Sequence, residues 1–238
     1  MKRKLYLTVG LLLLLLTVAS SALAGEVIDA IVATVNRQPL FRSEWDEATC
    51  FEAFMQQKSL AQLTPADRAR ALQRLIDRQL LQAQMGGETF LQPSEKDVDK
   101  DVAKLRAQIP NGREDQSWQK SLADYELTPE TLRAHLRTEV QVMNFVEVRL
   151  RPTVHVQPEE IESYYKNQLL PDLQKTGGTT VTLNEVEPRI RELLVQQRMD
   201  ELLEAWLHNL RQQAEIRTTV PVPAENGVTD QGRASGAN

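Results

Sequence analysis

Three histidines, His135, His155 and His208, are the residues of this sequence best suited to acid–base chemistry near neutral pH. They are far apart in the chain. The sequence contains no nucleophile elbow, no zinc-protease helix motif, no P-loop and no dinucleotide-binding glycine motif. Two of the histidines stand beside a leucine on a predicted helix and the third lies in a connector, settings in which a histidine is usually structural or exposed. We therefore expect no catalytic residues and no enzyme activity.

Metal-binding chemistry has little support either. Cys50 is the single cysteine, which excludes an internal disulfide framework and any zinc or iron–sulfur site built from several cysteines. Glu159, Glu160 and Glu162 lie close together, but acidic side chains at the start of a predicted helix suit the positive end of its dipole. We expect no metal and no cofactor, and we interpret Cys50 as a small buried residue rather than as half of an intermolecular disulfide.

Side chains that could hold an apolar polypeptide segment are the strongest remaining signal. Methionine is unbranched and polarisable, so it repacks against varied partners. The candidate client-binding residues are Phe51, Phe54, Met55, Met85, Phe90, Met143 and Phe145. Around a groove, such residues would hold unfolded polypeptide. The competing interpretation is that they fill the core, and for any single residue this second interpretation is preferred.

The charge balance argues against a nucleic-acid partner. The 238 residues carry 28 Lys and Arg against 33 Asp and Glu, a formal net charge of −5, and only 5% of them are aromatic. Non-specific binding to nucleic acid needs a basic surface. We expect no nucleic-acid binding.

Residues 1–24 have the three parts of a secretory signal peptide. A basic start at Lys2 to Lys4 is followed by an apolar run, Leu5 to Val18, and then by a small-x-small cleavage site that ends at Ala24. We expect cleavage between Ala24 and Gly25, export of the mature protein, and no stable membrane insertion afterwards. The alternative is an uncleaved anchor, although the apolar run is short for a span of about 20 residues.

Capping residues and apolar periodicity predict a mainly α-helical domain at 25–220, with short strands near both of its ends. Strands are expected at 27–36, 39–41 and 215–220, and helices at 43–58, 64–85, 94–109, 115–125, 128–150, 158–166 and 186–210. Ser43 is expected to cap the first helix, and Thr-Pro pairs at Thr64 and Thr128 start two others. We expect a short linker at 168–183 and a disordered tail at 221–238.

Several motifs occur in an order that is typical of one protein family. An apolar strand ends in Val35-Asn36, a Thr-Pro-Glu helix start stands at 128–130, and a Val-x-Val connector lies at 154–156. A Glu-Ile-x-x-Tyr-Tyr helix follows at 160–165, and a long helix and a strand come last at 186–216. Each motif alone is modest, but in this order they resemble the SurA-type periplasmic chaperones over most of residues 26–220.

The resemblance implies a helical SurA-N-like chaperone domain in which the N-terminal region packs with the long C-terminal helix. It also implies a periplasmic, ATP-independent holdase that binds unfolded or nascent outer-membrane and secreted proteins through an apolar groove. Two alternatives stay open. One is a dedicated assembly factor or subunit with a single partner, and the other is a residual peptidyl-prolyl isomerase. A homo-oligomer is also open.

The chain departs from the family at one place. A parvulin-type prolyl isomerase domain, on the order of a hundred residues as compact domains commonly are, normally lies between the Tyr-Tyr helix and the C-terminal helix. Only residues 168–183 occupy this place, and they include no histidine, cysteine or aromatic residue. Such a short stretch cannot form a domain with its own core, so prolyl isomerase activity is not expected.

Overall fold

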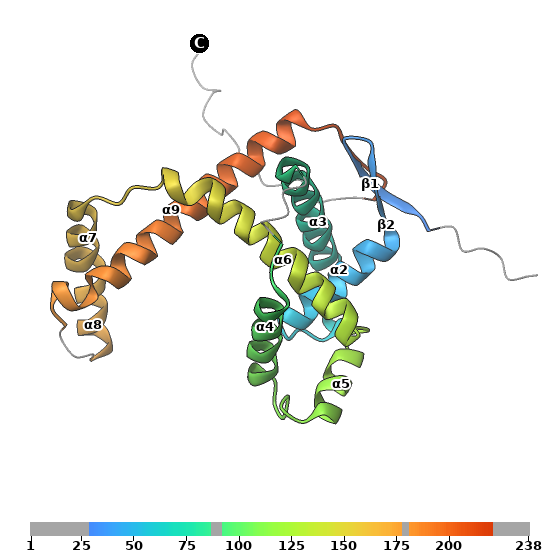
Figure 1. Ribbon diagram of the computed structural model, residues 1–238, viewed down its shortest axis with the longest axis horizontal. Helices are drawn as coiled ribbons and strands as arrows, with labels where there is room; N and C mark the ends of the chain where they lie inside the picture. Colours follow the sequence, from blue (N-terminus) through green and yellow to red (C-terminus); the bar gives the residue numbers. More distant parts are fainter. Residues whose placement is uncertain (1–28, 87–91, 178–180, 221–238) are drawn as a thin grey trace, which may run out of the picture. The chain divides into compact units, whose positions relative to one another are not determined.

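The computed structural model describes residues 29–86, 92–177 and 181–220. The chain divides into two units, Met1–Ala30 and Ile31–Asn238, and the elements below all belong to the second. The strands are β1 (Ile31–Val35), β2 (Gln38–Phe41) and β3 (Ile216–Thr218). The helices are α2 (Arg42–Met55), α3 (Pro65–Met85), α4 (Glu95–Gln108), α5 (Asp115–Ala123), α6 (Pro129–Leu150), α7 (Pro158–Tyr164), α8 (Leu170–Thr176) and α9 (Leu183–Gln213). The unit is therefore mainly α-helical with a small sheet, which confirms the expected fold class (Figure 1).

The sheet joins segments from opposite ends of this unit. Its strand order is β2-β1-β3, and both pairs are antiparallel. Asn36 and Arg37 form the two-residue turn between β1 and β2 with φ of 50° and 69°, left-handed values that match the twist of a tight hairpin. On the other side of β1, the Asn36 N–H donates to the Glu215 carbonyl at 2.9 Å. The strands near the two ends of this unit therefore belong to one sheet.

Local capping determines where the helices begin. At α3, Thr64 Oγ1 accepts from the Asp67 N–H at 3.2 Å, and Asp67 Oδ2 accepts from the Thr64 N–H at 2.8 Å, a complete capping box. The expected cap at Ser43 is wrong, because α2 begins one residue earlier, directly after the hairpin. There the carboxylate of Glu44 accepts from the Phe41 N–H at 2.8 Å.

Helix α2 lies between two apolar clusters. The first cluster joins the sheet, α2 and α3, and its buried members are Val32, Ala33, Val35, Leu40, Trp45, Ala48, Ala71, Leu72, Leu75, Ile76 and Leu80. The end of α9 and β3 pack against this cluster through Leu210, Ala214 and Ile216. The second cluster joins α2 with α4, α5 and α6, and its buried members are Phe51, Phe54, Val98, Trp118, Leu122, Leu127, Leu132 and Leu136. Packing of the N-terminal region with the C-terminal helix, as expected, is therefore observed.

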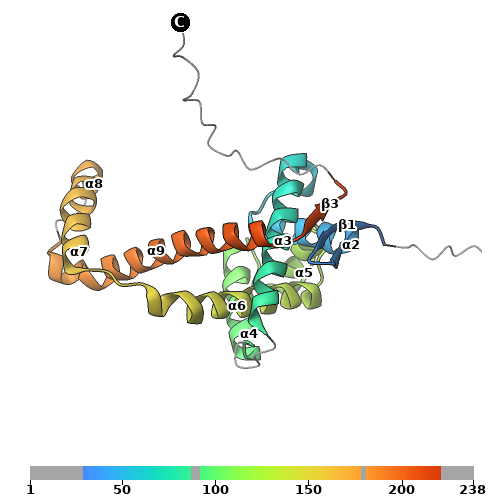
Figure 2. The same ribbon diagram turned by 90° about the horizontal axis from the view of Figure 1, so that it is seen from above.

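Helix α9 changes partners along its length, and both views show it running from α7 to the sheet (Figures 1 and 2). Its buried residues Ile190 and Met199 are nine positions apart, which places them on opposite faces at 3.6 residues per turn. Midway along α9, Arg198 pairs with Glu160 of α7 at 3.2 Å. Near its end, Trp206 packs on Phe145 of α6 with ring centroids 5.7 Å apart. A single apolar stripe along α9 therefore cannot make both the contacts near α7 and the contacts with α6.

The segment expected to be a linker at 168–183 is partly helical. Helix α7 passes through a π-helical turn at Tyr165–Leu169 directly into α8, which ends at Gly177 with φ of 67°. Pro171 lacks the N–H that a regular α-helix would need. The wider π-helical turn before it carries the chain past this missing donor, which is why the helix does not end near residue 166 as expected. Residues 178–180 lie outside the described part.

The Asp77–Arg211 ion pair fastens α9 to α3. Arg211 Nε and Nη2 each lie 2.7 Å from one carboxylate oxygen of Asp77, and both side chains are largely shielded from solvent.

We expect Asp77→Asn to lower the free energy of unfolding by about 2 kcal/mol, because the bidentate ion pair is lost and the Arg211 cation stays largely buried. Urea denaturation measures this change. The control is Asp101→Asn, which removes an exposed pair with Lys104 within α4 and should cost less than about 0.5 kcal/mol. Equal costs for the two variants would contradict the assignment.

Among the helices that the structure describes, none combines the length and the apolar character needed to cross a membrane. The proposed signal peptide at 1–24, its cleavage site at Ala24 and Gly25, and the proposed tail at 221–238 all lie outside the described residues.

Candidate functional site

A groove of about 670 Å³ is lined by residues of α2, α3, α4, α6 and α9. We call it the apolar groove. Its apolar lining residues are Phe51, Met55, Leu81, Leu105, Leu136, Val140, Val142, Met143, Leu203 and Leu207. The volume falls within the range of pockets that enclose a small organic ligand. It therefore suits a few side chains of a polypeptide and not a folded domain.

The charged residues that line the groove are paired with partners in the protein itself. Arg78 Nη2 lies 2.6 Å from Glu139 Oε1, and Arg74 Nη1 lies 3.1 Å from Glu52 Oε2. The ion pairs of Asp77 and Asp101 described above also belong to this lining. Burial raises the pKa of Glu52 although three nearby arginines, Arg74, Arg78 and Arg70, act to lower it. The groove thus offers apolar contact inside a lining whose charges are locally compensated.

Three of the residues expected to bind clients line the apolar groove. Phe51 forms a buried part of its wall, with 4% of its surface exposed. Met55 at the end of α2 and Met143 on α6 are 44% and 67% exposed. These two methionines supply accessible, flexible apolar surface at the groove, which is what contact with varied side chains requires.

The other expected residues do not line the groove. Phe54 is 4% exposed and makes edge-to-face contacts with Trp118 and Tyr125, at centroid distances of 6.0 and 5.5 Å. Met85 and Phe145 are buried in a third small cluster beside Trp206. The core encloses these three side chains, so they do not belong to the proposed site. Phe90 lies outside the described residues.

Sequence reasoning did not single out most of the groove. The residues that it missed are Leu81, Leu105, Leu136, Val140, Val142, Leu203 and Leu207. Their helical spacing was visible, but the same spacing describes a core-facing stripe. Nothing in the sequence separates an apolar residue that meets another helix from one that meets a groove.

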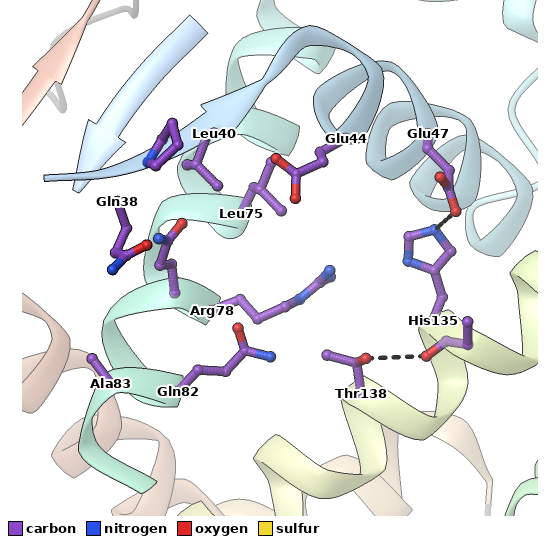
Figure 3. A pocket seen from close by; sticks show the side chains of 13 residues that line it. Gln38, Leu40, Glu44, Glu47, Leu75, Arg78, Gln82, Ala83, His135 and Thr138 are labelled. Carbon is purple, nitrogen blue, oxygen red and sulfur yellow. Dashed lines mark hydrogen bonds and ion pairs between the residues drawn. The ribbon is translucent and has the colours of Figure 1, made fainter. Parts of the chain in front are cut away.

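A second, polar cleft of about 710 Å³ lies between β2, α2, α3 and α6. Its lining includes Gln38, Glu44, Glu47, Gln79, Gln82, His135 and Thr138. Figure 3 shows Arg78 extending from α3 into this cleft, and Glu47 meeting His135 at its side. Because Arg78 lines both the polar cleft and the apolar groove, the two hollows share a wall at this side chain.

His135 supports the groove wall from the polar side. Its ring stacks on Phe51 with centroids 4.6 Å apart and planes 14° from parallel, and its Nε2 lies 2.9 Å from Glu47 Oε1. Burial lowers the pKa of His135, and the nearby Arg78 lowers it further, against the opposing effect of Glu47 and Glu139. At neutral pH the imidazole is therefore uncharged and acts as an aromatic partner of Phe51.

This environment predicts an acid-dependent loss of stability. The unfolded chain takes up the His135 proton near its ordinary pKa of 6.5, whereas the folded chain does so only at lower pH. The contribution of uncharged His135 to the free energy of unfolding is therefore complete above pH 6.5, and it is lost as the pH falls below that value. We expect His135→Phe, which keeps the stacked ring but cannot titrate, to be less sensitive to this fall. Urea denaturation between about pH 8 and pH 5 measures the free energy of unfolding of both proteins. An equal decrease in the two proteins would contradict the assignment.

Cys50 is half-buried against the second cluster, not fully buried as expected, and it does not line the apolar groove. Burial raises the pKa of the Cys50 thiol, and the carboxylate of Glu126 adds to this rise, so the reactive thiolate is disfavoured. Within residues 29–86, 92–177 and 181–220, no group of three or more His, Cys, Asp or Glu side chains is placed to hold a metal ion. What the site offers is apolar contact.

A family model described as the SurA-like N-terminal domain matches residues 1–146, which is more than half of the sequence. The chain belongs to this family. The SurA-like match includes α2, α3 and α4 and most of α6, so it contains Phe51, Met55 and Met143, whereas α9 follows it.

One solved structure similar to this SurA-like protein comes from a study of PEB4 and Cj1289, described as two structurally related SurA-like chaperones of Campylobacter jejuni. It is 12% identical in sequence, with a TM-score of 0.46, and the match covers 80% of this chain and 99% of that chain. No curated protein matches the sequence.

Proposed function

We propose that this protein is an exported, ATP-independent chaperone that holds unfolded segments of outer-membrane or secreted proteins in its apolar groove. The observation that carries the proposal is a groove with ten apolar lining residues from five helices, in a chain of the SurA-like family. Covering apolar surface of the client contributes about 25 cal/mol per Å², against the cost of ordering both partners. Binding is then weak and reversible, which suits release without an energy source.

An unfolded apolar segment is the occupant that best fits this lining. Since the charged side chains around the groove are compensated by one another, a segment without charges loses nothing by entering. The flexible side chains of Met55 and Met143 adapt to client residues of different shape. A folded partner would instead present a mostly polar surface to a groove of only about 670 Å³.

The proposal includes a periplasmic location, reached through the signal peptide at 1–24, and the absence of prolyl isomerase activity. It is supported by the short stretch at 168–183, which is too small to be a separate isomerase domain. A protease-free assay of proline isomerisation on a short peptide tests the second part. Turnover clearly above the uncatalysed rate would contradict it.

Suppression of aggregation tests the holding activity directly. A chemically unfolded client is diluted from denaturant, and light scattering is followed with and without the protein, in the absence of ATP. We expect scattering to fall as protein is added, and no effect from a folded protein of similar size and net charge. Unchanged scattering at a several-fold excess of protein would overturn the proposal. Capture from the periplasm of one stoichiometric partner, with no unfolded precursors, would favour a dedicated assembly factor instead.

A further inference from the structure

We propose that Met55 and Met143 form an oxidation site in the apolar groove, where a two-electron oxidant such as hydrogen peroxide switches client binding off. The switch rests on the proposed chaperone function. The site itself rests on geometry alone, because it depends only on which thioethers a small oxidant can reach.

Exposure separates the methionines of the described chain into two pairs. Met55 and Met143 are 44% and 67% exposed, and both line the apolar groove. Met85 and Met199 are 7% and 4% exposed, and neither lines the groove. An oxidant in solution therefore meets the two groove methionines before it meets either methionine of the core.

The reaction is a balanced oxygen transfer. A lone pair of the methionine sulfur attacks one oxygen of the peroxide, the O–O bond breaks, and a sulfur–oxygen bond forms. The second peroxide oxygen takes up the proton that the transferred oxygen gives up, and it leaves as water. Sulfur loses two electrons and the peroxide gains them. The product is methionine sulfoxide, which dedicated reductases convert back to methionine.

Oxidation changes the groove at the place where a client would lie. A sulfoxide is polar and accepts hydrogen bonds, so it holds water that must be removed when an apolar segment covers it. The cationic groups of the lining, Arg74, Arg78 and Lys104, are already paired with carboxylates and do not replace that water. The oxidised groove thus favours water over an apolar client.

The test uses hydrogen peroxide on the purified full-length protein and three readouts. Peptide mass spectrometry follows oxygen uptake at each methionine. Fluorescence of an apolar naphthalene-sulfonate dye follows the accessible apolar surface. Light scattering of an unfolded client follows the holding activity. We expect Met55 and Met143 to be oxidised before Met85 and Met199, with dye affinity and client affinity each falling by roughly tenfold, as a buried polar group without a partner would cause. Methionine sulfoxide reductases should restore both affinities.

Two matched variants identify the residues responsible. The double variant Met55→Leu with Met143→Leu keeps an apolar groove but has no thioether there, so peroxide should leave its dye and client affinities unchanged. The double variant Met85→Leu with Met199→Leu keeps the groove methionines, so it should respond to peroxide as the unaltered protein does. Circular dichroism confirms that each variant is folded.

The outcomes distinguish a failure of the site from a failure of the proposed function. Oxidation of Met85 or Met199 as early as the groove pair would overturn the site. Loss of dye affinity when peroxide is added to the double variant Met55→Leu with Met143→Leu would overturn the site as well. If the reduced protein binds dye but never suppresses aggregation, the chaperone function fails, and with it the switch, while the oxidation site stands. If oxidation weakens dye binding but leaves client holding intact, the switch alone is overturned.

Discussion

A variant with both Met55→Gln and Met143→Gln should hold unfolded clients about tenfold less tightly than the unaltered protein, because two amides must lose water when an apolar segment covers them. Glutamine has nearly the length and helix propensity of methionine. Both positions are also solvent-exposed, so the free energy of unfolding should change by less than about 0.5 kcal/mol. Titration of a fluorescent unfolded client measures the first effect, and urea denaturation measures the second.

Val148→Gln supplies the matched control for this variant. Val148 also lies on α6 and is 56% exposed, but it is not among the residues that line the apolar groove. Its replacement should leave client affinity unchanged. Equal weakening by Val148→Gln and by the methionine pair would show that clients bind a general apolar surface, and the groove assignment would then be abandoned.

Phe54→Ala should destabilise the protein by about 3–5 kcal/mol, the usual cost of removing an enclosed aromatic side chain. Phe54 fills the second cluster and contacts Trp118 and Tyr125 edge to face, so its loss leaves a cavity between α2 and α5. Denaturation in guanidinium chloride measures the change. Any loss of client holding in this variant should follow from unfolding, since the variant's folded fraction keeps the groove.

The adjacent residue provides the contrast. Met55→Ala, one position further along α2, should cost less than about 1 kcal/mol because its side chain is largely exposed. It should nevertheless weaken client binding. If Phe54→Ala is tolerated as well as Met55→Ala, then the second cluster is not the packed core described here.

Local chemistry explains why many elements were predictable. The Thr64-Pro65 and Thr128-Pro129 pairs start α3 and α6 as expected, because capping involves residues only three positions apart. Gly86 ends α3 with φ of 68°, a conformation that glycine adopts without strain. Two predicted boundaries were wrong because of a neighbouring element. Helix α2 begins at Arg42, directly after the hairpin, and not at Ser43. The π-helical turn continues the helix that was expected to end near residue 166.

By itself, the sequence determined the helical class, most helix boundaries and the family resemblance, because each depends on residues near one another in the chain. Only the tertiary structure decided which apolar side chains form the groove. Phe51 and Leu207 line the same groove although 156 positions separate them. Phe54 and Met55 are neighbours, yet one is enclosed and the other exposed. Hydrophobicity drives both kinds of residue out of water equally, and the difference lies in which helices pack together and which leave space between them.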